Sequence, residues 1–275
     1  MTVYLRPATL TEALAGLAAP DLRILAGGTD LYPAVQGAAL GGTVMDIAGL
    51  PELRGISRVG GGVRIGACTT WTQVMQADLP PALDALRQAA RQVGGWQIQN
   101  AGTIGGNLCN ASPAADGVPP LLACDAQVEL AGPDRTRHVA LADFIIGPRR
   151  TTLHQGEVVV AVLIPAAGLQ GRSVFLKLGS RAHLVISIAM VAARVVVRDG
   201  VVAAAALAVG SASPVARRLP RVEASIVGVP VNRMVIDDTM VAAALSPIDD
   251  VRATAAYRAG AAATLLRRAL AKAVT

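Results

Sequence analysis

Residues 100–130 read NAGTIGGNLCNASPAADGVPPLLACDAQVEL, and this stretch decides the fold and points to the chemistry of the chain. Its paired glycines let the backbone approach a ligand closely, and a hydroxyl and an amide flank them. Asp116 follows and can accept hydrogen bonds from ribose hydroxyls or an adenine amine. The candidate ligand-binding residues of this loop are Thr103, Gly105, Gly106 and Asn107.

Another Gly-Gly loop lies nearer the N-terminus, in ILAGGTDL (24–31), directly after an apolar strand pattern. Successive backbone amides in such a loop form a concave site for an anion. Without thiols and with few carboxylates, the loop suits a phosphate better than a metal, although an ordinary turn is the alternative. It matches neither GxGxxG nor GxxxxGK[ST]. Its residues are Ala26, Gly27, Gly28, Thr29 and Asp30, and together with the loop at 103–107 they could grip a diphosphate from two sides.

The two loops resemble those of the FAD-binding medium subunit of the molybdenum hydroxylases. This family includes xanthine dehydrogenase, aerobic carbon monoxide dehydrogenase and 4-hydroxybenzoyl-CoA reductase. The resemblance spans nearly the whole chain and continues through GEVVVAVLIP (156–165), FLKLGSR (175–181), ISIAMVAA (186–193) and YRAGAAATLLRRAL (257–270).

The resemblance implies a role for each candidate residue. The first diphosphate loop of the family is matched by Gly27, Gly28, Thr29 and Asp30, after Ala26, and the second by Thr103, Gly105, Gly106 and Asn107. Asp116 matches the carboxylate that holds the nucleoside portion. Lys177 matches a flavin-side basic residue, and Ile186 is a candidate for the flavin face. For Lys177 a solvated strand position is the alternative, and for Ile186 ordinary strand core.

The resemblance also implies cofactors and partners. FAD would be bound by this chain, the molybdenum cofactor by a large subunit, and two [2Fe–2S] clusters by a small subunit, in a dimer of heterotrimers. Carbon monoxide dehydrogenases carry a tyrosine near the flavin where this chain has Val185-Ile186. The aliphatic pair favours NAD modestly as the electron acceptor, while oxygen and a quinone stay open. The substrate pocket would lie on another polypeptide.

The pattern of expected elements predicts an α+β fold. A two-subdomain FAD-binding domain of the PCMH type is expected over 1–168, with subdomains of about 1–52 and 53–168. Asp199-Gly200 and two other glycine turns indicate β-hairpins. A C-terminal domain of antiparallel sheet plus a helix bundle is expected over 169–275, with helical patterns at 215–228, 239–246 and 250–273.

Composition excludes several other classes of protein. Aromatic residues are 3% of the 275 residues, too few for base stacking. The net charge of +6 is spread over pairs such as Arg149-Arg150, which indicates a mildly basic surface without a nucleic-acid arm. The N-terminus lacks a secretory pattern, and no apolar run is long enough to span a membrane, so we expect a cytoplasmic protein.

Cysteine and histidine usage indicates neither a metal site nor a catalytic site in the chain itself. Cys68, Cys109 and Cys124 are too few for an iron–sulfur cluster and are expected to be reduced thiols. The cysteine-rich insertion of 4-hydroxybenzoyl-CoA reductase is missing. His138, His154 and His183 show no metal-ligand spacing. No catalytic residue is predicted, because a bound flavin would carry the redox chemistry.

Two other functions stay open at this stage. One is a scaffold subunit that has lost FAD, against which the intact glycines of both loops and Asp116 count. The other is a stand-alone flavin reductase related to the cell-wall precursor reductases. The lack of an evident proton donor counts against that reductase.

Overall fold

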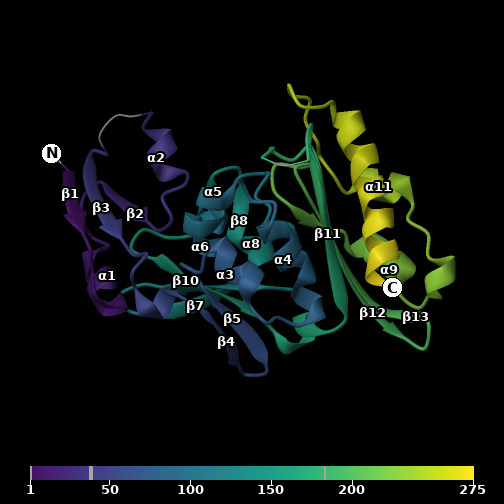
Figure 1. Ribbon diagram of the computed structural model, residues 1–275, viewed down its shortest axis with the longest axis horizontal. Helices are drawn as coiled ribbons and strands as arrows, with labels where there is room; N and C mark the ends of the chain where they lie inside the picture. Colours follow the sequence, from purple (N-terminus) through teal and green to yellow (C-terminus); the bar gives the residue numbers. More distant parts are fainter. Residues whose placement is uncertain (1, 37–39, 183) are drawn as a thin grey trace.

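The computed structural model describes residues 2–36, 40–182 and 184–275. The molecule is elongated, with the N-terminal sheet at one end and the long helix α11 at the other (Figure 1). Three main β-sheets follow one another along this axis. The α+β fold predicted from the sequence is confirmed.

The N-terminal sheet is a small parallel unit with strand order β1-β3-β2. Thr9 caps its first helix by accepting a hydrogen bond from the Glu12 amide. Its parallel strands and the helices between them form a βαβ-like unit. Its elements are β1 (Thr2–Leu5), α1 (Leu10–Gly16), β2 (Leu22–Leu25), α2 (Leu31–Ala34) and β3 (Gly42–Asp46), followed by the 3-10 helix η1 (Pro51–Leu53).

The middle sheet is antiparallel, with order β4-β5-β10-β6-β7. Its central strand, β10 (Val158–Ile164), is a nearly continuous buried apolar run, which suits a strand covered on both faces. The other strands are β4 (Ile56–Val59), β5 (Gly62–Gly66), β6 (Gln127–Ala131) and β7 (Thr136–Ala140), and a small separate sheet pairs β8 (Ile145–Gly147) with β9 (Arg150–Thr151).

Short helices pack around the middle sheet and enclose the largest core cluster, which includes Trp71 and Phe144. Thr70 and Gln73 form a capping box that begins α3. The helices are α3 (Trp71–Gln76), η2 (Pro81–Leu83), α4 (Asp84–Ala90), α5 (Trp96–Ala101), α6 (Ile104–Asn110), α7 (Val118–Ala123), α8 (Leu141–Phe144) and η3 (Ala166–Leu169).

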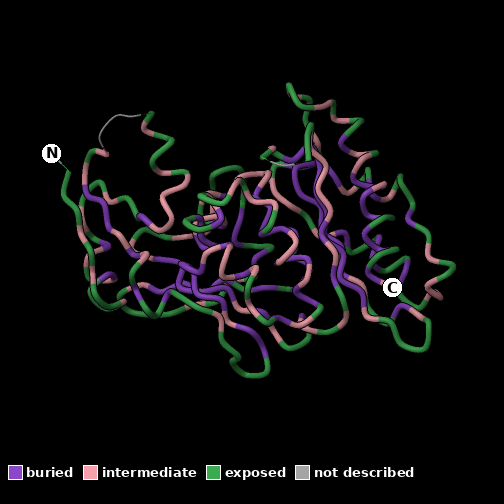
Figure 2. Tube along the Cα trace, viewed as in Figure 1, coloured by how far each residue is buried: buried purple, intermediate pink, exposed green. Residues whose placement is uncertain are grey.

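The C-terminal sheet is antiparallel, in order β11-β12-β13-β14, and helices cover both of its faces. Figure 2 shows long buried stretches along the central strands of this part. The elements are β11 (Arg172–Leu178), β12 (Ala189–Arg198), β13 (Val201–Gly210), β14 (Arg217–Arg218), α9 (Pro220–Ile226), η4 (Val231–Arg233), α10 (Asp238–Ala243) and α11 (Ala255–Ala273).

The helix predicted over 215–228 is wrong in its first half. Arg217 and Arg218 form a two-residue edge strand that pairs with Val209 and Ala208 of β13. The helix begins only at Pro220, a residue that favours the first helical turn because its missing N–H leaves no bond unmade there.

Among the described residues, none of the helices combines the length and apolar character needed to cross a membrane.

Candidate functional site

The structure brings the two glycine loops, far apart in sequence, into direct contact. A side chain on Gly27 would overlap the carbonyl oxygen of Ala101 and lie 2.9 Å from Cα of Gly102. A Cβ on Gly102 would in turn lie 3.5 Å from Oγ1 of Thr29. Glycine at position 27 is therefore required by the close approach of two backbones.

A cavity of about 470 Å³ lies between the loops. Its volume falls in the range of roughly 300–1,000 Å³ that is usual for small-molecule sites. The start of strand β10 and the end of β2 contribute apolar residues to its wall. Nine of the residues predicted from the sequence line it: Ala26, Gly27, Gly28, Thr29, Asp30, Thr103, Gly105, Gly106 and Asn107.

The two loops differ in the hydrogen-bond donors that they offer. In the described part of the chain, no residue accepts a hydrogen bond from the backbone N–H groups of Gly27 through Asp30. In the second loop, Gly105 N–H donates to the Ala67 carbonyl at 2.8 Å and Gly106 N–H to Thr103 Oγ1 at 3.1 Å. The first loop thus lines the cavity with residues whose amides have no partner in the described structure, whereas the second supplies mainly a close-packed wall.

Asn107 carries a buried polar atom without a partner. Its side-chain oxygen Oδ1 has no hydrogen-bond donor in the described structure, although the residue lines the cavity. Buried polar atoms are nearly always paired, because leaving one unpaired costs free energy. An orphaned acceptor on a residue of the cavity wall fits a donor group of a ligand.

Arg149 is a cavity residue that sequence reasoning missed. It has a left-handed backbone, with φ of 59°, in the turn between β8 and β9. Its guanidinium donates to Asn110 Oδ1, and Asn110 Nδ2 donates to Asp30 Oδ1 at 3.0 Å. A cation is thereby tied to the first loop. The Arg149-Arg150 pair was the signal in the sequence, but it reads as surface charge.

Asp116 and Lys177 form a buried ion pair, with 2.7 Å between Oδ2 and Nζ. Ser187 Oγ donates to the other carboxylate oxygen at 3.1 Å. Burial raises the pKa of Asp116, and the charge and hydrogen bond of Lys177 oppose that rise. Since the two charged groups are in contact, both side chains lie at the same place beside the site.

The pair lies just behind the cavity wall and does not line it. A Cβ on Gly117, next to Asp116, would be 2.9 Å from the Asn107 side-chain oxygen. Lys177 Nζ lies 3.4 Å from the carbonyl oxygen of Gln92, whose neighbour Val93 lines the cavity. The predicted residues Asp116 and Lys177 are therefore adjacent to the cavity at its Val93 side.

Ile186 lies outside the cavity and is 62% exposed. Leu184 in the same loop is exposed too, and its Cδ2 would lie 3.2 Å from a Cβ on Gly95. The loop thus meets the start of α5, where Trp96 is also exposed. His183, which the sequence analysis considered, lies outside the described residues.

Two of the three thiols, those of Cys68 and Cys109, line the cavity. Cys109 is accessible through the cavity yet lies deep within the protein, and burial raises the pKa of both thiols to about 12. They are neutral at ordinary pH. Within the described residues, no group of three or more histidine, cysteine or acidic side chains is arranged to hold a metal ion.

The chain matches two protein families, which together cover most of its length. Residues 1–167 match the FAD binding domain in molybdopterin dehydrogenase, and residues 175–273 match the CO dehydrogenase flavoprotein C-terminal domain. The chain is 34% identical over 239 residues to the putative xanthine dehydrogenase FAD-binding subunit of Escherichia coli K12. That alignment covers 85% of this chain and 82% of the relative.

Two further proteins, one an FAD-subunit and one a solved CO dehydrogenase, are similar to this chain. The nicotinate dehydrogenase FAD-subunit of Eubacterium barkeri is 35% identical over 222 residues, which are 78% of this chain and 75% of that one. The solved structure of reconstituted CO dehydrogenase from Oligotropha carboxidovorans matches with a TM-score of 0.91 at 28% identity. It covers 100% of this chain and 98% of the matched chain.

Proposed function

The chain belongs to the family of FAD-binding subunits of the molybdenum hydroxylases, and on this premise we propose that it binds FAD in the cavity between its glycine loops and passes electrons from a [2Fe–2S] subunit to an external acceptor. The observation that carries the proposal is the cavity wall, which combines the free amides of Gly27 to Asp30 with the orphaned oxygen of Asn107.

The wall suits the diphosphate of FAD. Free amides of a glycine loop bind phosphate oxygens, and the Arg149 guanidinium adds a positive charge beside them. The carboxylate of Asp30 would repel a phosphate, but Asn110 occupies one of its oxygens. The cavity residues Ala26, Thr29, Thr103, Gly105 and Gly106 would shape the two sides of this cradle.

We assign Asp116 and Lys177 together to the flavin end of the cofactor, because the ion pair places them at one point. This assignment moves Asp116 away from the nucleoside role that the resemblance implied. When bound, the flavin supplies the redox chemistry. Lys177 would hold a positive charge near the ring system, and Asp116 would hold the ammonium group in place and moderate its charge.

NAD is the proposed acceptor, supported by the exposed aliphatic side chains of Leu184 and Ile186, in the loop that meets Gly95 at the start of α5. Such a surface offers apolar contact to a planar ring. The test reduces the purified complex anaerobically and then mixes it with NAD, with a quinone or with oxygenated buffer. Faster reoxidation by NAD would support the proposal. Reoxidation by oxygen or a quinone alone would replace NAD with that acceptor.

The proposed partners are a large subunit with the molybdenum cofactor and a small subunit with two [2Fe–2S] clusters, in a cytoplasmic dimer of heterotrimers. Relatives that are an FAD-binding subunit and a medium chain of larger enzymes support a multi-subunit assembly. Affinity purification of the tagged chain from its native host, followed by native mass spectrometry, tests composition and stoichiometry. Recovery of the chain alone would count against the assembly.

We also propose that the chain divides into a FAD-binding domain over 1–168, with subdomains of about 1–52 and 53–168, and a second domain over 169–275. The ranges of the two family matches, 1–167 and 175–273, support this division. Limited proteolysis should first cleave near residues 165–172. First cuts elsewhere would move the boundary.

The decisive experiment is an absorption spectrum of the purified chain, with identification of the chromophore released on denaturation. Flavin bands and released FAD are expected. A colourless chain that also fails to take up added FAD would overturn the proposed site and favour the scaffold function. Release of FAD from a chain that oxidises NADH without partners would favour the stand-alone reductase.

A further inference from the structure

A buried guanidinium lies at the start of helix α11, far from the glycine loops in sequence. Arg258 is 1% exposed. Its Nη1 donates to the carbonyl oxygens of Ile188 at 2.6 Å and Ser211 at 3.0 Å, and its Nη2 to Asp250 Oδ1 at 2.6 Å. Arginine is almost never fully buried unless it is paired, so these contacts hold the charge where it is.

Arg252 extends this cluster towards the surface. It pairs with the second oxygen of Asp250 at 2.6 Å and donates to the Ser187 carbonyl at 3.3 Å. Hydrogen bonds from Arg252, with a further one from Arg258, hold the pKa of Asp250 well below its usual range. Two arginines bridged by one carboxylate therefore grip the consecutive carbonyls of Ser187 and Ile188.

Two routes lead from this cluster to Asp116. On the first, the gripped residue Ser187 donates its hydroxyl to Asp116 Oδ1 at 3.1 Å. On the second, Ser211 accepts from Arg258 and donates its own N–H to the Pro113 carbonyl at 3.0 Å, three residues before Asp116. Arg258 thus fixes both the backbone that carries the hydroxyl and the loop that carries the carboxylate.

We propose that Arg258, acting with Asp250 and Arg252, is a positioning residue for the redox site. It fixes Ser187 and the loop before Asp116, and so sets the position of the Asp116–Lys177 ion pair. The inference rests on the proposed function, in which this pair lies at the flavin end of bound FAD. Helix α11 then contributes to the flavin environment without touching the cofactor.

Stability alone is a poor explanation of the cluster. Replacing a buried ion pair by packed apolar side chains is often neutral or stabilising, because desolvating the charges is costly. This cluster is also incompletely paired: in the described structure, Arg258 Nε and Ser211 Oγ are buried without a partner. What the charges provide is a fixed placement of two backbone segments that converge on Asp116.

The experiment compares Arg258→Met with the matched control Arg268→Met, an exposed arginine on the same helix. Each variant is purified with its FAD, and the flavin midpoint potential is measured by dye-coupled titration. Arg258→Met should shift the equilibrium towards the oxidised flavin by about tenfold, which is about 30 mV for a two-electron couple. The shift should have the same sign as that of Lys177→Met, since both remove the ammonium from its place.

Measuring the effect of Arg258→Met with and without Lys177 distinguishes a positioning role of Arg258 from a general loss of stability. In the double variant with Lys177→Met, Arg258→Met should add little further shift, because the group that it positions is gone. Arg258→Lys should restore part of the potential. If Arg258→Met does not fold, the flavin midpoint potential of Arg252→Gln tests the inference instead, since this partly exposed residue donates to the Ser187 carbonyl.

The outcomes distinguish this inference from the proposed function. FAD bound with an unchanged potential in the Arg258 or Arg252 variant overturns the positioning role alone. An equal shift with and without Lys177 also overturns it. A wild-type chain that holds no FAD overturns the proposed function together with this inference.

Discussion

At the scale of single residues, Gly27 is the glycine of the two loops that leaves the least room for a side chain. A methyl group there would overlap the Ala101 carbonyl, so Gly27→Ala must push the two loops apart. We expect the variant to fold but to lose most of its FAD, because the free amides of the first loop would no longer face the second loop. Flavin absorbance per chain measures this loss.

The matched control for Gly27 is Gly260→Ala. Gly260 lies in α11, and a Cβ there would meet nothing within 4 Å. This control should keep its FAD and gain up to about 1 kcal/mol of stability from the higher helix propensity of alanine. Full flavin content in Gly27→Ala would show that the contact between the loops is not needed for binding.

Gly106→Val is expected to abolish retention of FAD as well, because a β-branched side chain would block close approach of the backbone to the ligand. In the structure a Cβ on Gly106 would lie 2.9 Å from Thr103 Oγ1, the hydroxyl that caps α6. Flavin absorbance again provides the readout. Full occupancy in this variant would count against the two-loop cradle.

Asn107 offers a test in which two measurements move in opposite directions. Leucine at this position removes an orphaned buried oxygen, so urea unfolding of the FAD-free Asn107→Leu variant should show equal or greater stability. Titration with FAD should show weaker binding by about tenfold, the loss expected for one hydrogen bond of roughly 1.4 kcal/mol. Unchanged affinity would mean that Asn107 does not bind the cofactor.

The sequence predicted the members of the two loops because glycine pairs beside hydroxyl and amide residues form a local pattern. It did not predict Arg149, since an arginine in a turn carries no local sign of the segment that it will contact. It also gave no sign that Asp116 and Lys177 pair. Their separation along the chain hides a contact that arises only when the C-terminal sheet packs against α7.

At the scale of elements, the sequence predicted strands better than the ends of helices. β10 and the hairpin turn at Asp199-Gly200 follow directly from an apolar run and a turn signal. The segment 215–228 has a helical pattern of apolar residues, yet its first residues complete the C-terminal sheet. Backbone pairing to the preceding strand, β13, outweighed the local helical pattern there.

One ion pair of the middle sheet predicts a pH dependence. Glu157, directly before β10, pairs with Arg137 of β7 at 2.7 Å, and the hydrogen bond from Arg137 lowers the pKa of Glu157 to about 2. Because the folded-state pKa lies below the ordinary value of 4.5 for an unfolded chain, the pair contributes in full above pH 4.5. Its contribution is lost as the pH falls from 4.5 towards 2.

The measurement is urea unfolding of wild type and Arg137→Gln at pH 6 and pH 3. The gap in unfolding free energy between them should be larger at pH 6 and should shrink at pH 3. Arg135→Gln, an exposed arginine of the same hairpin, serves as the control and should show no such dependence. A gap of the same size at both pH values would argue against this role of the pair.

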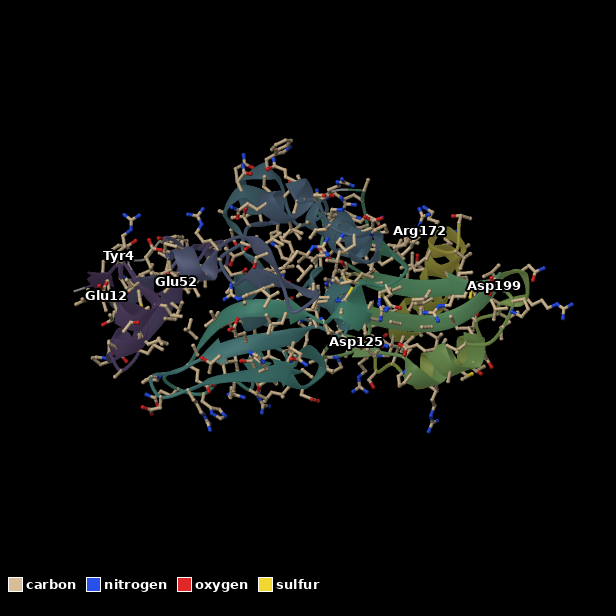
Figure 3. All side chains as sticks on the ribbon, turned by 90° about the horizontal axis from the view of Figure 1, so that it is seen from below. Tyr4, Glu12, Glu52, Asp125, Arg172 and Asp199 are labelled. Carbon is tan, nitrogen blue, oxygen red and sulfur yellow. The ribbon has the colours of Figure 1, made fainter. Side chains whose placement is uncertain are left out.

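At the scale of the whole molecule, two large cores are joined by a thin apolar contact and a set of charges. Asp125, labelled in Figure 3 where the middle and C-terminal parts meet, pairs with Arg194 of β12 and Arg218 of β14. Arg194 also donates to the Ala123 carbonyl at 2.6 Å. The apolar part of the contact is built largely of alanines around Phe175 and Met190.

Phe175 is therefore the side chain on which coupling between the two cores depends most. It is 2% exposed on β11, facing α4 and α7, and its neighbours are too small to fill the space that Phe175→Ala would leave. Such a truncation costs about 3–5 kcal/mol. Because the loss falls on the contact between the cores, we expect them to unfold separately.

The two tryptophans give this expectation a direct readout. Trp71 and Trp96 both lie in the middle part of the chain, so their fluorescence reports on that part, whereas far-ultraviolet circular dichroism reports on the whole chain. The two urea transitions should coincide in the wild type and in the exposed-site control Val235→Ala, and separate in Phe175→Ala. Coincident transitions at a lower midpoint in Phe175→Ala would mean that the charges around Asp125 suffice to keep the molecule one cooperative unit.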